Sequence, residues 1–198
     1  MNQNSLENFL PKDAIHYIHQ WLKDEPIRLK VLPSRKTKLG DYRYLINEQK
    51  HQITLDGNLK PDAFFFVFTH EIAHMMVYNQ FKNRVLSHGK EWQLMFGKML
   101  LESIEIYPKN LRPYIYRHAL KPKASVGADR LLNQHLFVDP TDWDKWVEKL
   151  PYGQKFRLGK RIYIRGEKQK IRYICREVKT NKLYLVNGQA VVDEIIHS

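Results

Sequence analysis

Two histidines and a glutamate stand at a spacing that suits metal chemistry. His70 and His74 are four residues apart, and Glu71 directly follows the first of them. On a helix, residues i and i+4 share one face, so both imidazoles can reach one ion at about 2.0 to 2.1 Å. The pattern predicts a site for one zinc ion, with Glu71 in reach of a water beside it. The alternative is a pair of core histidines satisfied by hydrogen bonds.

A third protein ligand has to come from elsewhere, because a catalytic zinc commonly takes three and leaves one position open. His88 is the best candidate, since it precedes a second predicted helix and Gly89 permits close approach of the backbone. The other candidates are His118, His135, Glu91, Glu102 and Glu105. A metzincin would carry Gly-x-x-His directly after His74, where Val77 and Tyr78 stand instead, so that arrangement is excluded.

The two histidines belong to a segment that predicts a buried helix. Residues 61–81 are apolar on nearly every side, which is typical of a helix covered by other elements. Imidazole and carboxylate groups in such a helix need partners, and a metal ion would be one. A second helix is predicted after Ser87 as its N-cap, and the two helices are expected to pack together.

The segments before these helices predict a helix and a sheet. Residues 11–23 have apolar side chains at helical spacing, with Pro11 in the first turn. Residues 27–55 alternate apolar and polar side chains, which predicts two or three antiparallel strands with Gly40 in a connection.

The segments after the two helices are less regular. Residues 108–140 carry four prolines and no sustained periodicity, so irregular structure with one short helix is expected, followed by a short helix capped by Thr141. Residues 151–198 contain short β-prone runs divided by glycines. We therefore expect a domain over residues 1–150 and a small β module over residues 151–198.

Cysteine usage and hydropathy exclude several classes of protein. Cys175 is the only cysteine, which rules out an internal disulfide framework and a zinc site built from several thiolates. No stretch approaches the roughly 20 apolar residues that cross a bilayer, and the polar N-terminus has no signal-peptide pattern. The sequence predicts a cytoplasmic protein with no membrane partner.

Three blocks in this order resemble the SprT-like domain, the zinc-peptidase domain of bacterial SprT proteins and of eukaryotic DNA-dependent proteases that digest DNA–protein crosslinks. The blocks are His70–His74, the block His88–Trp92 that is similar to the family's H-G-x-x-[FW], and Leu39–Arg43 followed by Ile53–Leu55. The resemblance spans roughly residues 10 to 150 and is more specific than H-E-x-x-H alone.

The resemblance implies an α+β fold with a zincin-like helical core, a helix that carries the H-E-x-x-H motif and a small N-terminal antiparallel sheet. It implies zinc on His70, His74 and His88, with Glu71 as the general base that hydrolyses a peptide bond through activated water. One departure concerns the tail: many bacterial SprT proteins end in a zinc ribbon with paired cysteines, whereas Cys175 stands alone here. A second zinc is therefore not expected.

Positive charge is concentrated in the tail. The chain has a net charge of +12, and between Lys155 and Lys182 there are eleven Lys or Arg residues against two Glu. Six of these cations are candidate phosphate contacts: Arg157, Lys160, Arg161, Arg165, Arg172 and Arg176. Four aromatic residues between them are candidates for base stacking, the alternative being that they form the core of the module: Phe156, Tyr163, Tyr173 and Tyr184.

The expected function is a zinc-dependent peptidase that acts on DNA-associated proteins, with DNA bound by the tail. One alternative is a non-catalytic zinc-containing factor that binds nucleic acid or is associated with transcription elongation. Glu71 argues against it, because a structural zinc site needs no base. The other alternative is a general cytoplasmic peptidase whose basic tail only keeps it soluble.

Overall fold

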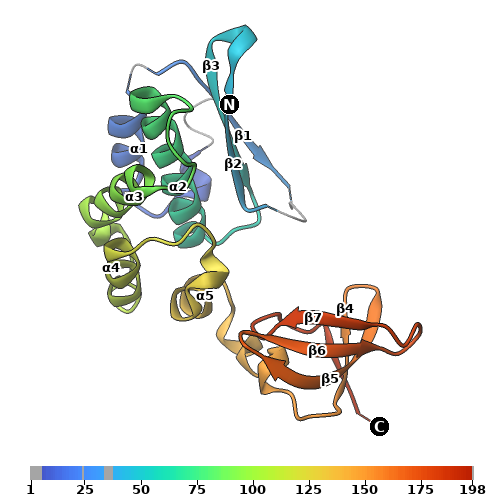
Figure 1. Ribbon diagram of the computed structural model, residues 1–198. Coiled ribbons are helices and arrows are strands. Elements are labelled where there is room, and N and C mark those ends of the chain that lie inside the picture. Colours follow the sequence, from blue (N-terminus) through green and yellow to red (C-terminus); the bar gives the residue numbers. More distant parts are fainter. Residues whose placement is uncertain (1–5, 24, 34–37, 198) are drawn as a thin grey trace. The chain divides into compact units, whose positions relative to one another are not determined.

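The chain is a mixed α and β protein made of two compact units. The computed structural model describes residues 6–23, 25–33 and 38–197, and the units are Met1–Phe137 and Val138–Ser198 (Figure 1). The helices of the first unit are α1 (Ile15–Leu22), α2 (Pro61–Phe81), α3 (Lys90–Glu102), α4 (Arg112–Leu120) and α5 (Arg130–Leu136), and its strands are β1 (Ile27–Leu32), β2 (Gly40–Leu45) and β3 (Lys50–Asp56). Each unit has a hydrophobic core of its own.

The sheet of the first unit has the order β1-β3-β2 and is mixed. β2 and β3 form an antiparallel hairpin, whereas β1 runs parallel to β3, so the prediction of an antiparallel sheet is wrong for that pair. The reason is the length of the connection: a whole strand and its turns separate β1 from β3, which is enough chain for a crossover. Gly40 is the first residue of β2, whereas the sequence predicted that it lies in a connection between strands.

Helix α2 begins and ends where the sequence predicts. Pro61 occupies the first turn of α2. Twelve residues of the helix are buried, and they lie on more than one side of it, because β2 and β3 cover one side and α3 covers another. His70, Glu71 and His74 lie in the middle of this helix. None of the helices in the described residues combines the length and the apolar character that crossing a membrane requires.

The helices around α2 differ from their predicted limits. α1 begins at Ile15, and α3 begins after Gly89 with no side chain capping it, so the predicted Ser87 cap is wrong. The stretch 108–140, predicted to hold one short helix, contains α4 and α5. Its prolines do not prevent this, because Pro113 lies in the first turn of α4, where a missing backbone N–H costs nothing.

The second unit is a five-stranded antiparallel sheet with the order β7-β6-β5-β4-β8. Its strands are β4 (Lys155–Leu158), β5 (Arg161–Gln169), β6 (Arg172–Glu177), β7 (Leu183–Asn187) and β8 (Glu194–Ile196). The unit starts at Val138, earlier than the predicted residue 151, because Val147 and Leu150 belong to its core and Trp146 pairs with Val191. A 3₁₀ helix, Pro140–Lys145, follows Asp139 as its N-cap in place of the helix predicted from Thr141.

Candidate metal centre

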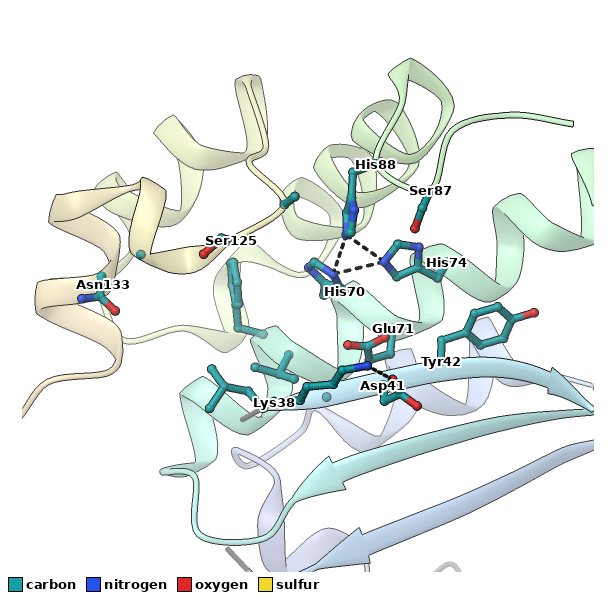
Figure 2. A pocket seen from close by; sticks show the side chains of 16 residues that line it. Lys38, Asp41, Tyr42, His70, Glu71, His74, Ser87, His88, Ser125 and Asn133 are labelled. Atoms are coloured by element: carbon teal, nitrogen blue, oxygen red, sulfur yellow. Dashed lines mark hydrogen bonds and ion pairs between the residues drawn. The ribbon is translucent and has the colours of Figure 1, made fainter. Parts of the chain in front are cut away.

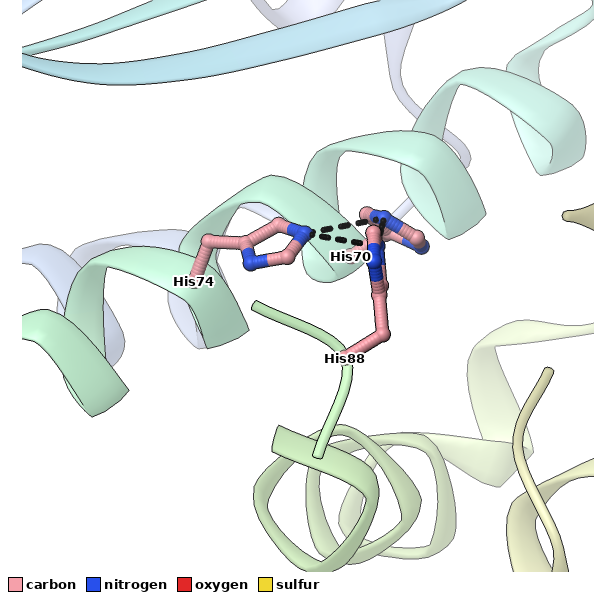
Figure 3. A group of neighbouring side chains, drawn as sticks. All are labelled: His70, His74 and His88. Atoms are coloured by element: carbon pink, nitrogen blue, oxygen red, sulfur yellow. Dashed lines mark hydrogen bonds between the residues drawn. The ribbon is translucent and has the colours of Figure 1, made fainter. Parts of the chain in front are cut away.

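Three imidazole nitrogens converge at the middle of α2. The Nε2 atoms of His70 and His74 are 3.2 Å apart, and the Nε2 atom of His88 lies 3.3 Å from the first and 3.1 Å from the second (Figure 3). His70 and His74 share one face of α2, and His88 reaches them from the segment that precedes α3. Among the described residues, this is the one group of His, Cys, Asp and Glu side chains that could hold a metal ion.

The three distances match a metal site better than a set of hydrogen bonds. A ring nitrogen carries either a proton or a lone pair, so three Nε2 atoms in mutual contact cannot all be hydrogen-bonded to one another. A tetrahedral ion with Zn–N bonds of about 2.0 to 2.1 Å would hold its nitrogens about 3.3 to 3.4 Å apart. The observed separations of 3.1 to 3.3 Å are close to that value. The donor set therefore fits a cation such as zinc.

The three histidines are held in their neutral, metal-binding form. Burial lowers the pKa of His70 to about 2, with the neighbouring His74 and His88 contributing. Burial also lowers the pKa of His74 to about 4, and it lowers the pKa of His88. Neutral imidazoles offer the lone pairs that a metal ion requires.

Aromatic rings fix the orientation of these imidazoles. The indole of Trp92 lies with its centroid 4.6 to 5.3 Å from the centroids of His70, His74 and His88. On the other side, the ring of Tyr42 is nearly parallel to that of His74. The Tyr42 hydroxyl is hydrogen-bonded to His51, 3.0 Å away, and in Figure 2 it points away from the three nitrogens. Tyr42 is therefore a support for the site and not one of its reacting groups.

Glu71 lies between the three histidines and strand β2 (Figure 2). Its side chain is 6% exposed, so the carboxylate is sheltered from bulk solvent. Gly40 makes room for it, because a Cβ atom there would come within 2.5 Å of Glu71 Oε1. The sequence does not reveal this role of Gly40, since the approach of β2 to α2 is a tertiary contact.

The histidines and Glu71 open into a cavity of about 560 Å³. Its walls include the start of β2, helix α2, the segment between α4 and α5 that contains Ser125, and Asn133 of α5 (Figure 2). Asp41 lies in the β2 wall, where burial raises the pKa of its carboxyl group but hydrogen bonds from Lys38 and Arg43 outweigh this and lower it. A volume of this size is typical of sites for small molecules or for part of a larger substrate.

The competing ligands lie elsewhere. His118 is fully buried and donates a hydrogen bond to Asp129, 3.0 Å away. His135 stacks on Tyr114, with a centroid distance of 4.0 Å. Glu91, Glu102 and Glu105 are not in the group that could hold the ion. The structure therefore brings together the three histidines that the sequence ranked first.

The basic residues of the second unit do not form one surface with the aromatic rings. Phe156, Tyr163 and Tyr173 are buried in its core, and so cannot stack on bases. Arg165 lies over the ring of Tyr173, 4.3 Å from its centroid, on the inner side of the sheet. Arg157, Arg172 and Arg176 lie on the opposite face, Lys160 lies at the turn between β4 and β5, and Arg161 is the first residue of β5. The stacking arrangement expected from the sequence is absent for these three rings.

We compared the chain with known proteins in three ways. A scan against protein-family models finds no match to the chain, and searches of the curated proteins and of the solved structures find none either.

Proposed function

We propose that the chain is a zinc-dependent metallopeptidase of the zincin type that hydrolyses peptide bonds in protein substrates. The observation that carries this proposal is a three-histidine donor group that opens, together with Glu71, into a cavity. Structural zinc sites are closed by four protein ligands, whereas catalytic sites keep a position free for water or substrate. Three nitrogen donors beside a cavity agree with the catalytic kind.

Each residue of the centre then has a distinct task. His70, His74 and His88 hold the ion through neutral Nε2 atoms. Bound zinc would supply Lewis acidity, which lowers the pKa of water and polarises a carbonyl group. The Glu71 carboxylate accepts a proton from the attacking water and passes it to the leaving amine, which is a task for a sheltered base within hydrogen-bond reach.

An extended polypeptide is the substrate that suits the cavity best. β2 is an edge strand of its sheet, with β3 on one side and no further strand on the other among the described residues, and its first residues line the cavity. An exposed strand edge offers main-chain hydrogen bonds to an extended peptide. This supports a peptidase over an enzyme for small molecules, and it agrees with the resemblance to SprT-like domains.

The experiment that tests the proposal combines metal content with cleavage of casein by the full chain. We expect one zinc per chain and cleavage that chelation abolishes. Glu71→Gln should keep the zinc and lose the cleavage, whereas Glu102→Gln, on the exposed end of α3, should keep both. A Glu71→Gln chain with full activity would rule out the mechanism, and a chain without zinc would rule out the enzyme.

The class of protein substrate is proposed from features other than the metal centre. Action on DNA-associated proteins is a further part of the proposal, supported by the net charge of +12 and by the resemblance. Running the casein assay with and without single-stranded DNA separates it from a general peptidase, which DNA would leave unaffected. Zinc without cleavage, together with DNA binding, would favour the non-catalytic factor instead.

A further inference from the structure

The sheet of the second unit has two faces of opposite character. Along β5, β6 and β7, successive side chains alternate between them, as the pleat of a strand requires. The inner face carries Tyr163, Tyr173, Cys175 and Val186, all buried in the core of the unit. We call the opposite side the outer face.

The outer face is apolar over three strands. Its aliphatic side chains are Ile162 and Ile164 on β5, Ile174 on β6, and Leu183 and Leu185 on β7. The side chains of Leu183 and Leu185 are 64% and 50% exposed, and the three isoleucines are partly exposed. Contiguous exposed aliphatic residues on one surface of a soluble domain are typical of a binding surface.

An arginine stands in the middle of this apolar surface. In the strand register, Arg176 of β6 lies beside Ile164 on one side and Leu183 on the other, and Ile174 is the next outward residue along its own strand. Arg176 is exposed and has no ion pair with any carboxylate of the described chain. A guanidinium surrounded by aliphatic groups gains most from a carboxylate when a partner excludes water from both.

Most of the charges that the strand register places on this surface are positive. Arg172 lies on β6 two outward positions from Arg176, and Lys155 pairs with Ile164 from the β4 side. Arg157 on β4 is already paired with Glu194, 2.9 Å away. Three cations without such a partner therefore remain on this face of the described chain, which suits an anionic ligand.

The combination fits a peptide better than a nucleic acid. A nucleic-acid surface meets phosphates with cations and bases with aromatic rings, but the rings here lie on the inner face. Isoleucine and leucine side chains instead bury well against the aliphatic side chains of a partner.

We propose that the outer face of the second unit binds a segment of another protein in which an acidic side chain is flanked by aliphatic ones. The acidic group pairs with Arg176, and the aliphatic groups cover the leucines and isoleucines around it. The segment is separate from the substrate of the metal centre, and the proposal does not depend on the chain being an enzyme.

The test measures binding of a labelled synthetic peptide to the full chain, with one glutamate between leucines in a serine and glycine background. We expect Arg176→Glu and Leu185→Asp each to weaken binding by at least about tenfold, as for central interface residues. Arg176→Lys should retain part of the affinity, because it keeps the charge but loses the bidentate geometry. Replacing the glutamate of the peptide with glutamine should also weaken binding, and replacing it with lysine should abolish it.

Matched controls separate the effect of changing the outer face from the effect of making the same kind of substitution elsewhere on the chain. Lys179→Glu makes the same charge change at an exposed turn, and Leu94→Asp makes the same apolar-to-acidic change at a 75% exposed position in the first unit. Both should bind the peptide as the unaltered chain does. The proposal is overturned if the unaltered chain does not bind the peptide, or if the controls weaken binding equally.

Two other occupants give different results. If the outer face binds nucleic acid, Arg176→Glu and Leu185→Asp should release a single-stranded oligonucleotide and leave peptide binding unchanged. If it binds a second copy of the chain, sedimentation should show a dimer that Leu185→Asp dissociates. Either result would contradict the peptide as its ligand.

Discussion

A Cβ atom on Gly40 would lie 2.5 Å from Oε1 of Glu71, a separation that real Cβ atoms do not adopt. The same atom would lie 2.7 Å from Cγ1 of Val67 on the preceding turn of α2. The absence of a side chain at this one position of β2 therefore allows the edge strand and the proposed base to occupy neighbouring positions. Any larger residue has to move the strand, the helix or the carboxylate.

The first prediction concerns Gly40→Ala. The added methyl group should displace the Glu71 carboxylate or the strand that lines the cavity, and kcat/KM for peptide cleavage should fall by about 100-fold, as expected for a misplaced catalytic group. Zinc content should stay at one ion per chain, because the atoms nearest to the added methyl group belong to Glu71 and Val67 and not to a histidine. Lys50→Ala, an exposed change on the neighbouring strand β3, is the control and should retain activity. Full activity of the alanine variant would contradict the assignment of Glu71 as the base.

The second prediction concerns the third metal ligand. In His88→Ala, two histidines remain, so zinc should bind more weakly and stabilise the fold less. At a free zinc concentration of about 100 times Kd, a bound ion raises the free energy of unfolding by about 2.7 kcal/mol. Thermal unfolding with and without zinc should show this stabilisation in the unaltered chain and in His135→Ala, which lies on α5 outside the site. An undiminished effect of zinc on His88→Ala would exclude His88 as a ligand.

The third prediction concerns Asp129, which joins α4 to α5. Its carboxylate accepts hydrogen bonds from His118, Arg117 and the backbone N–H of Leu132. Burial raises the pKa of Asp129, but these interactions outweigh it, so the pKa lies below the ordinary value of an aspartate. A lowered pKa means that the ionised form stabilises the fold above the unfolded-state pKa, and that this contribution is lost as pH falls through the folded-state pKa.

Asp129→Asn should therefore lower the free energy of unfolding by about 2 kcal/mol near pH 7, which is the range for a lost cap combined with charged hydrogen bonds. The difference between the two chains should shrink below a pH of about 3.9, as the carboxyl group of the unaltered chain becomes protonated. Chemical denaturation at several pH values measures this. A difference that is independent of pH would show that the charge of Asp129 has no part in the effect.

The fourth prediction concerns the boundary between the units. A chain that ends at Phe137 should fold and keep its zinc, because its core is complete without the second unit. A chain that ends at Leu150 should be less soluble, because Val147 and Leu150 lose the core of the second unit, to which they belong, and Trp146 loses its pairing with Val191. Expression, solubility and zinc content of the two truncations check this. Equal behaviour of both would contradict the boundary after Phe137.

The fifth prediction concerns nucleic acid. If the charge of the second unit binds single-stranded DNA, the affinity of the full chain should fall steeply with salt, with a slope of about 0.7 per phosphate contact on logarithmic axes. Lys160→Glu, at the exposed turn before β5, should reduce both the affinity and the slope. The chain that ends at Phe137 should lose the binding, and a truncation that binds as well as the full chain would contradict the prediction.

The sequence by itself determined the local features of this protein. The spacing of His70 and His74 places both on one face of any helix, and the apolar residues of 61–81 require that helix to be buried; both follow from helical geometry and the cost of exposing apolar surface. The strand segments of the second unit were likewise readable from β-prone runs between glycines. The single Cys175 was enough to exclude a multi-cysteine zinc site.

Only the tertiary structure decided which distant residues meet. The convergence of His88 on α2, the parallel pairing of β1 with β3, and the fit of Gly40 against Glu71 all depend on how elements pack, which local periodicity does not encode. The faces of the second sheet are a further case: Arg176 and Tyr173 are close in sequence, but the pleat of the strand places one on the outer face and the other in the core. Sequence showed that charge and aromatic rings were present, and the fold separated them.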